Sequence, residues 1–324
     1  MPASAGFLIS PAMNKSPAPS VYFIGLGALG ILYAKAIENA LGKHSVTFAA
    51  DKKRCERYKQ EEIYLNDQRC FFNFVTPDES SAPADFLFFS VKGTALDDAI
   101  KTAAAPLVNE NTVIISLLNG ISSEEILKKA FPQANVLYCI GQKMDALKQG
   151  SKVIYRDLGE LCIGIPKNNQ NPKLEAALRR TEDFFDSISL PYVSEEDIIH
   201  RMWCKWMLNV GVNQAVMINE GKFRTVHQEG APRETMKAAM REVLALSQKN
   251  GVCLTEDEYL QYLGIIDKLN PEGMPSMRQD GVNKRRSEVE MFAGTVVALG
   301  KELGVPTPVN EKILQKVREM ESNY

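Results

Sequence analysis

Three polar residues on an otherwise apolar segment are the first candidates for chemistry. Residues 202–216 are apolar nearly all round, which predicts a buried helix, yet Lys205, Asn209 and Asn213 recur at every fourth position. This spacing places the three side chains on one face of the helix. Because polar groups inside a protein need partners, the strip predicts a polar cavity or a bound ligand. The alternative is that the strip is the solvated face of the helix.

Lys205 is the candidate proton donor of this strip. In the sequence it lies between Trp203 and Trp206. Desolvation by such neighbours lowers the pKa of an ammonium group, towards values that are useful for proton transfer.

Glu288 is the second titratable candidate. Apolar residues follow it at three, four and eleven positions, a helical stripe that points the carboxylate towards the core side. It can then be a partner for Lys205 or for a substrate hydroxyl, or simply a first-turn acid that favours the helix dipole. Ser287 is expected to cap a helix that starts near residue 288, with Glu290 completing a capping box.

A polar loop is expected just upstream, over residues 275–280. The hydroxyl of Ser276 and the backbone amides of such a loop can hold a carboxylate. An ordinary connector has the same composition, and that alternative stays open.

A glycine-rich turn follows the first apolar run, at Gly25-Leu26-Gly27-Ala28-Leu29-Gly30. This G-x-G-x-x-G motif is informative here because it follows an expected strand, opens an expected helix and precedes a second strand. Gly25 permits the tight turn, Gly27 allows the backbone to approach a diphosphate at the helix N-terminus, and Gly30 allows close packing. The motif predicts a dinucleotide site.

The choice of cofactor depends on the end of the second expected strand. Asp51 lies 21 positions after Gly30, where an acid bonds the ribose of NAD. Lys52, Lys53 and Arg54 follow at once, and cations there hold the extra phosphate of NADP. Asp51 can equally be the N-cap of the helix that follows.

Lys92 and Asn119 lie just past two further expected strands. Ligands of open parallel sheets bind outside the carboxyl ends of the strands, so both side chains are expected to face the dinucleotide crevice. As alternatives, Lys92 is a solvated loop lysine and Asn119-Gly120 an ordinary turn.

The elements that position these residues follow from hydrophobic patterning. Continuous apolar runs alternate with helical patterns, which indicates a parallel sheet covered on both faces. Strands are expected at 21–24, 45–50, 86–91 and 112–118, with runs near 135–140, 152–156 and 160–165 extending the sheet. Helices are expected at 28–41, from Lys52, and at 94–104, 122–130, 195–216, 231–250, 256–268, 286–303 and 309–321.

These patterns predict an α/β chain in which an N-terminal Rossmann-type parallel sheet domain precedes an all-helical C-terminal domain. We expect a loose N-terminal tail over residues 1–20, a dinucleotide-binding domain over 21–190 and a helical substrate-binding domain over 191–324. The crevice between two such domains is the default ligand site.

Composition excludes several classes of function. The 324 residues carry 38 Lys+Arg against 40 Asp+Glu, so no electrostatic footprint for nucleic acid is present. The longest apolar run of the tail is three residues, and no stretch approaches a membrane span. The six cysteines are scattered without a C-x-x-C pair, which predicts neither disulfides nor a metal site and fits a reducing, cytoplasmic location.

Taken together, the motifs resemble those of the ketopantoate reductase family. The matching pieces, in the family's order, are GLGALG at 25–30, VKGT from Val91, LNG from Leu118, the K-x-x-x-N-x-x-x-N run at 205–213, PSMRQD from Pro275, R-R-S-E-V-E from Arg285 and LGVPTPVN at 303–310. The resemblance implies an NADPH-dependent reductase that converts 2-dehydropantoate to (R)-pantoate in pantothenate biosynthesis.

The resemblance also implies roles for individual residues. Lys205 is similar to the family's proton donor, Asn209 and Asn213 to its substrate contacts, and Ser276 to its contact for the substrate carboxylate. Further implied roles are cofactor contacts at Lys92 and Asn119, with Asn119 also facing substrate, and an acid near both ligands at Glu288.

The sequence departs from the family pattern at the second strand. Family members often carry an arginine there, whereas this chain has Asp51 with Arg54 three residues on, so NADH stays open beside NADPH. Other branched 2-keto acids are alternative substrates. The opening FIGLGALG also resembles 3-hydroxyacid dehydrogenases, although residues 200–204 lack the glycine expected before their catalytic lysine. A non-enzymatic dinucleotide sensor is a further alternative, and a homodimer is possible.

Overall fold

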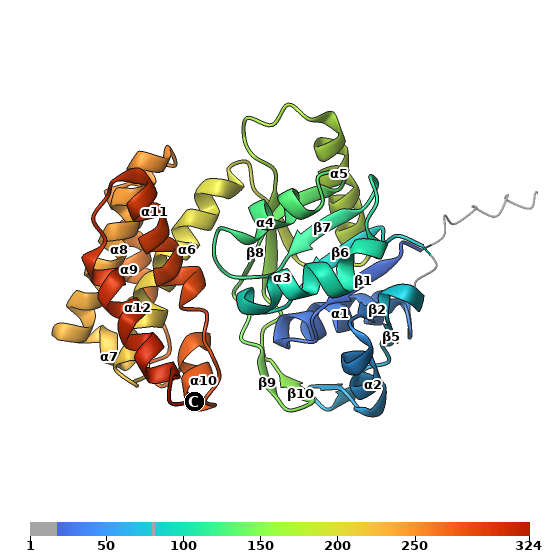
Figure 1. Cartoon of the computed structure of the whole chain (residues 1–324), viewed down its shortest axis with the longest axis horizontal. Coiled ribbons are helices and arrows are strands. Elements are labelled where there is room, and N and C mark those ends of the chain that lie inside the picture. Colours follow the sequence, from blue (N-terminus) through green and yellow to red (C-terminus); the bar gives the residue numbers. More distant parts are fainter. Residues whose placement is uncertain (1–17, 80–81) are drawn as a thin grey trace, which may run out of the picture.

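The structure is a computed structural model that describes residues 18–79 and 82–324. Most of the expected tail, residues 1–17, lies outside the described residues. Ser20 at its end is anchored, because its backbone N–H donates to Asp85 Oδ2 at 2.9 Å. The chain forms two regions, a sheet covered by helices and a group of helices beside it (Figure 1).

The main sheet confirms the expected α/β fold. Its eight strands lie in the order β12-β11-β8-β7-β6-β1-β2-β5. From β5 to β8 all neighbours are parallel, whereas β11 runs antiparallel to β8. The strands are β1 (Val21–Ile24), β2 (Val46–Ala49), β5 (Asn73–Val75), β6 (Phe86–Phe89), β7 (Val113–Ser116), β8 (Asn135–Gln142), β11 (Glu160–Gly164) and β12 (Tyr192–Ser194).

Continuous apolar strands arise because helices cover both sheet faces. In β6, Phe86 and Phe88 face one core, shared with α1 (Ala28–Leu41) and α5 (Pro172–Ser187). Leu87 and Phe89 face the other core, shared with α3 (Leu96–Ala99) and α4 (Ser123–Ala130). This second core continues through the group of helices, so both regions share it. Short 3₁₀ turns are η1 (Pro77–Glu79), before β6, and η2 (Gly93–Ala95) and η4 (Ala105–Leu107). The helix α3 continues directly into the π-helical turn η3 (Ile100–Ala104).

A separate four-stranded sheet has the order β4-β3-β10-β9. The expectation that residues 152–156 extend the main sheet is therefore wrong. In β10 (Lys152–Ile154) Val153 is buried between two exposed neighbours, a period of two that suits a strand covered on one side. The other strands are β3 (Tyr64–Leu65), β4 (Gln68–Arg69) and β9 (Leu147–Gln149).

The second region is helical, and α6 (Ile198–Ile218) lies between it and the sheet (Figure 1). The helices expected over 195–216, 231–250, 256–268 and 309–321 are present near those bounds, whereas the helix expected over 286–303 is helical only from residue 290. The last sheet strand, Tyr192–Ser194, lies past residue 190, so the sheet region extends beyond the expected division. The remaining elements are α2 (Lys52–Gln60), α7 (Arg224–His227), α8 (Ala231–Asn250), α9 (Glu256–Asp267), α10 (Ser276–Val282), the π-helical turn η5 (Glu290–Gly294), α11 (Thr295–Leu303) and α12 (Pro308–Glu321).

One feature of this region differs from expectation. Residues 276–282 form the short helix α10 rather than a loop. None of the helices in the described part of the chain has the length and apolar character needed to cross a membrane.

Candidate active site

The glycine-rich turn packs against the end of β6. Gly25 has φ +104°, a conformation that favours glycine. Ser90, which follows β6, donates its hydroxyl to the Gly25 carbonyl at 2.5 Å. A Cβ atom on Gly27 would lie 2.9 Å from the Ser90 carbonyl, and one on Gly30 would meet the Ser90 hydroxyl. The close packing expected of the motif is present, and Ser90 is a partner that the sequence analysis missed.

The start of α1 follows directly from the glycine-rich turn. Among the described residues no side chain caps this helix, whose first residues are Ala28 and Leu29. Its first N–H groups are thus free to bind an anion. Beside the turn lies a cavity of about 320 Å³, lined among others by Leu26, Ala50, Arg54 and Lys92. A cavity of this size at strand ends suits part of a dinucleotide.

Asp51 and Arg54 form an ion pair at the rim of this cavity. Asp51 caps α2, because its carboxylate accepts from the Arg54 backbone N–H at 2.9 Å. The Arg54 guanidinium lies 2.8 Å from Asp51 Oδ2 and 3.0 Å from Asp98 Oδ2. The hydrogen bond to Asp98 raises the pKa of Arg54. Asp51 is therefore the N-cap of α2, one of the two roles that the sequence left open for it. Arg54, the cation expected to bind a phosphate, is paired with two acids, Asp51 and Asp98.

Lys205 lies at the junction of the two regions. Its ammonium donates to the backbone carbonyl of Gly141 in β8 at 2.5 Å and to Asn119 Oδ1 at 3.3 Å. Burial lowers the pKa of Lys205, in the expected direction. Trp206 is buried beside it in the sequence and donates to the Met291 carbonyl at 3.1 Å. The backbone carbonyl of Gly141 thus belongs to the site, although no pattern of side chains in the sequence predicts it.

Glu288 completes a chain of contacts with Lys205. Asn119 donates its side-chain N–H to Glu288 Oε2 at 3.1 Å, so the amide bridges the ammonium and the carboxylate. Burial raises the pKa of Glu288. The structure therefore brings together Lys205, Asn119 and Glu288, from α6, the end of β7 and the segment before η5.

The expected capping box at Ser287 is wrong. The Ser287 hydroxyl donates to Glu321 Oε1 in α12 at 2.5 Å, and Glu290 pairs with Arg318 at 2.8 Å. Both side chains are engaged by α12, and the segment turns as a π-helix at 290–294. Contacts from another helix thus outweigh the local capping preference.

Lys92 spans the two regions. Its ammonium lies 2.5 Å from Asp280 Oδ1, in α10, and 3.4 Å from the Arg286 carbonyl. Asp280 is buried and near Glu288, and the sequence analysis did not single it out. The sequence shows Asp280 as an acid within the PSMRQD stretch, but no nearby residue predicts that it pairs with Lys92.

The remaining expected substrate contacts lie on α6 beyond Lys205 and at the start of α10. Asn209 and Asn213 are both buried, and Asn213 donates to Asn209 Oδ1 at 3.4 Å. Ser276 is exposed at the start of α10. Within the described residues, no hydrogen bond joins its side chain to the other candidate site residues.

Comparison with family models decides the family. Residues 21–168 match the model described as ketopantoate reductase PanE/ApbA, and residues 197–321 match the one for its C-terminal part. The chain belongs to the ketopantoate reductase PanE/ApbA family. The resemblance seen in the sequence motifs is confirmed, and membership makes the chain an oxidoreductase.

Individual relatives agree with this family over nearly their whole length. A 2-dehydropantoate 2-reductase from Aquifex aeolicus is 27% identical over 307 residues, covering 92% of this chain and 96% of the relative. A dimeric ketopantoate reductase from Staphylococcus aureus is 22% identical, with TM-score 0.74 and coverage of 94% and 99%. A D-mandelate dehydrogenase with NADH and anilino(oxo)acetate is 20% identical, with TM-score 0.80 and coverage of 93% and 98%.

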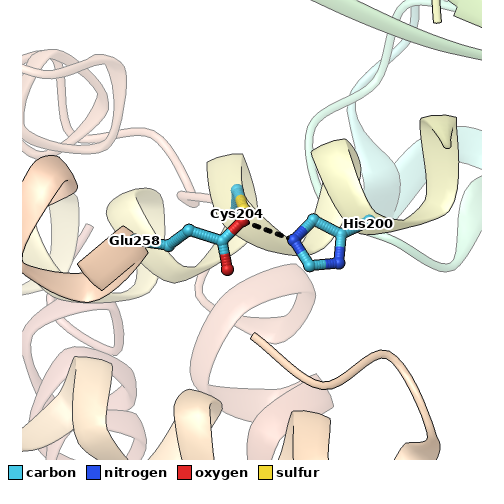
Figure 2. Close-up of side chains that lie close together, drawn as sticks. All are labelled: His200, Cys204 and Glu258. Carbon is cyan, nitrogen blue, oxygen red and sulfur yellow. Dashed lines mark hydrogen bonds and ion pairs between the residues drawn. The ribbon is translucent and has the colours of Figure 1, made fainter. Parts of the chain in front are cut away.

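A polar cluster holds the first turns of α6, the helix that carries Lys205 in this ketopantoate reductase fold. Figure 2 shows His200 and Cys204 of α6 facing Glu258 of α9. The Nε2 atom of His200 lies 2.6 Å from Glu258 Oε1, and its Nδ1 atom lies 3.1 Å from the Val252 carbonyl. The nitrogen, sulfur and oxygen atoms all lie within 4.8 Å of one another. The cluster fixes α6 against α9 one turn before Lys205, and no sequence pattern linked residues 54 positions apart.

Proposed function

We propose that this chain reduces 2-dehydropantoate to (R)-pantoate with NADPH, as a step of pantothenate biosynthesis. The observation that carries the proposal is the desolvated ammonium of Lys205, joined through Asn119 to Glu288 at the carboxyl ends of the sheet. Family membership supports the reaction type, and the names of the relatives support the substrate.

The residues of the glycine-rich turn fit a dinucleotide. The turn leaves no room for side chains at Gly27 and Gly30, and α1 starts without a side-chain cap, which suits a bound diphosphate. Residues 25–30, Lys92 and Asn119 would hold the cofactor, and Arg54 would hold the 2′-phosphate of NADPH. When bound, NADPH supplies a hydride from its nicotinamide ring.

Lys205 acts as the acid of the reaction. Hydride addition to the C2 carbonyl places negative charge on the carbonyl oxygen, and Lys205 Nζ stabilises this oxygen and gives it a proton. The products are the 2-hydroxy acid and NADP⁺, and Lys205 regains its proton from solvent. Asn119, Asn209 and Asn213 would orient the substrate, Ser276 would bind its carboxylate, and Glu288 would accept from its hydroxyl.

The test is a spectrophotometric assay of the purified protein with NADPH and 2-dehydropantoate. We expect NADPH oxidation that depends on the keto acid and is lost in Lys205→Ala. Turnover of Lys205→Ala within tenfold of the parent would reject the role of Lys205. Cofactor binding without turnover on any keto acid would instead favour a dinucleotide sensor, and activity on 3-hydroxy acids alone would favour a 3-hydroxyacid dehydrogenase.

A second candidate is the reduction of another branched 2-keto acid with NADH. Two observations favour it: Asp51 stands at the end of β2, and Arg54 is already engaged by Asp51 and Asp98. The same assay with NADH, and with a panel that includes phenylglyoxylate, separates the two candidates. A higher kcat/KM for NADH with a keto acid other than 2-dehydropantoate would replace the first proposal.

We further propose a homodimer, by likeness to the dimeric relative from Staphylococcus aureus. Light scattering coupled to size-exclusion chromatography would give twice the chain mass of 36.0 kDa. A mass equal to one chain at assay concentration would contradict it.

A further inference from the structure

A lysine from the small sheet reaches the glycine-rich turn. Lys148 belongs to β9, and its ammonium donates to the backbone carbonyl of Leu26, the second residue of the G-x-G-x-x-G motif. The two residues are 122 positions apart, so no local pattern relates them. In Figure 1, β9 and β10 appear at the bottom of the view, between α10 and α2.

In the described part of the chain, Lys148 has no acidic partner. Its side chain is partly buried, and desolvation lowers the pKa of its ammonium. Within the described residues, the Leu26 carbonyl is its hydrogen-bond partner and no carboxylate lies within ion-pair distance. The surrounding charges are one acid, Glu61, and two cations, Arg57 and Arg285. Arg57 pairs with Glu61 at 3.5 Å and Arg285 pairs with Asp280 at 3.4 Å. Among the described residues, Lys148 is therefore the cation of this group that has no ion-pair partner.

The two cations that line the cavity beside the glycine-rich turn, Arg54 and Lys92, differ from Lys148 in that respect. Arg54 is paired with Asp51 and Asp98, and Lys92 is paired with Asp280. A desolvated ammonium without a counter-charge is unfavourable unless an anion completes the site. The neighbouring start of α1 lacks a side-chain cap, and uncapped N–H groups at a helix start are suited to binding an anion.

We infer that Lys148 is a cofactor-binding residue, which contacts the diphosphate of the dinucleotide held by the glycine-rich turn. An ammonium has three donors, and the Leu26 carbonyl takes one of them. The other two remain for phosphate oxygens. The inference rests on the proposed function, because it requires a dinucleotide at this turn.

The test compares Lys148→Met, Lys148→Arg and the control Lys152→Met. Lys152 lies on the adjacent strand β10, is exposed, and stacks near the ring of Tyr64 rather than the turn. Dissociation constants are measured for NADPH and for adenosine 2′-monophosphate, which has a phosphate but no diphosphate. Melting temperatures are measured with and without NADPH.

We expect Lys148→Met to weaken NADPH binding roughly tenfold or more, as for loss of one charge-assisted hydrogen bond. Binding of adenosine 2′-monophosphate changes less than twofold, Lys148→Arg restores most of the NADPH affinity, and Lys152→Met resembles the parent. The ligand-free melting temperature of Lys148→Met stays equal or rises, because an uncompensated desolvated charge is removed.

Three results would overturn the inference. One is unchanged NADPH affinity in Lys148→Met. Another is an equal loss for both ligands. The third is a lowered ligand-free melting temperature with an unchanged NADPH-induced increase, which would make Lys148 a structural support of the turn. If the parent protein itself binds no dinucleotide, the proposed function fails and the inference with it, a result that is distinct from the other three.

Discussion

Arg54 and Lys205 are both cations near the carboxyl ends of the sheet, but their surroundings differ. Arg54 is exposed and lies within 3.0 Å of two carboxylates, and its pKa is raised. Lys205 contacts a backbone carbonyl and an amide oxygen, and burial lowers its pKa. The first cation is neutralised by its neighbours, whereas the second is poised to release a proton.

This difference separates binding from chemistry. A cation that is paired in water contributes little energy and is easily replaced. A desolvated cation that faces neutral oxygens favours a nearby developing anion, which is what hydride addition to a carbonyl creates. Variants on the Lys205 side should therefore have large effects on turnover, and variants on the Arg54 side small effects on cofactor choice.

The largest effect is expected for Lys205→Ala. Loss of the general acid should lower kcat about 10²–10⁴-fold while NADPH affinity stays within a few-fold. Pre-steady-state measurement of NADPH oxidation checks the chemical step directly. An equal fall in NADPH affinity would mean that Lys205 supports the cofactor instead, and the comparison with Arg54 would no longer hold.

Removing the Asn119 bridge between Lys205 and Glu288 should have the second-largest effect on kcat. Asn119→Ala removes both hydrogen bonds of the amide, and we expect kcat to fall roughly 10- to 100-fold, as for one or two hydrogen bonds to charged groups. Asn109→Ala is a matched control, since Asn109 makes turn contacts with residues 111–112. Steady-state kinetics that leave Asn119→Ala like this control would contradict the bridge.

The pH profile of kcat sharpens the role of Lys205. The ammonium form is the acid, so kcat should fall about tenfold per pH unit above the pKa of Lys205, which burial places below that of a free lysine. The charge of Glu288 raises the pKa of Lys205, so Glu288→Gln should move this limb to lower pH. A limb that stays in place, or moves upward, would contradict the coupling.

How much of the site the sequence could predict depends on how far apart along the chain the residues of each contact lie. The glycine-rich turn, the strip on α6 and the strand-end residues Lys92 and Asn119 follow from local patterns, and the structure places all of them at one edge of the sheet or on α6. The sign of the Lys205 pKa shift was also predictable from its apolar neighbours. Such features depend on periodicity and strand order, which a sequence encodes locally.

Contacts between distant segments could not be predicted in this way. The Lys92–Asp280 ion pair joins residues 188 positions apart, and Lys148 reaches Leu26 across 122. The capping box at Ser287 had the right residues, yet Glu321 and Arg318 of α12 engage them instead. In each case tertiary packing selects among partners that the sequence alone leaves equivalent.

The cluster that holds α6 should matter for stability more than for chemistry. Glu258→Gln weakens the contact with His200, and we expect a loss of about 1–3 kcal/mol in the free energy of unfolding. Glu256→Gln is the matched control, because Glu256 pairs with Arg241 at the surface, and we expect its loss of unfolding free energy to be clearly smaller than that of Glu258→Gln. Urea unfolding measures both, and equal losses would show that the cluster does not secure the helix.

The smallest effect is expected for Asp98→Asn, which frees one side of Arg54. The guanidinium then interacts more strongly with a 2′-phosphate, so the preference for NADPH over NADH, as a ratio of kcat/KM, should rise roughly two- to fivefold, the size of an exposed ion pair. Asp97→Asn makes the same change in net charge on the neighbouring exposed residue and should change the ratio by less than half as much. If both variants raise the ratio equally, the overall electrostatic potential, and not the contact between Asp98 and Arg54, sets the preference for NADPH over NADH. If Asp98→Asn lowers the ratio, Asp98 positions Arg54 for the 2′-phosphate instead of competing with it. Arg54 would then not be a cation neutralised by its neighbours, and its contrast with Lys205 would be wrong.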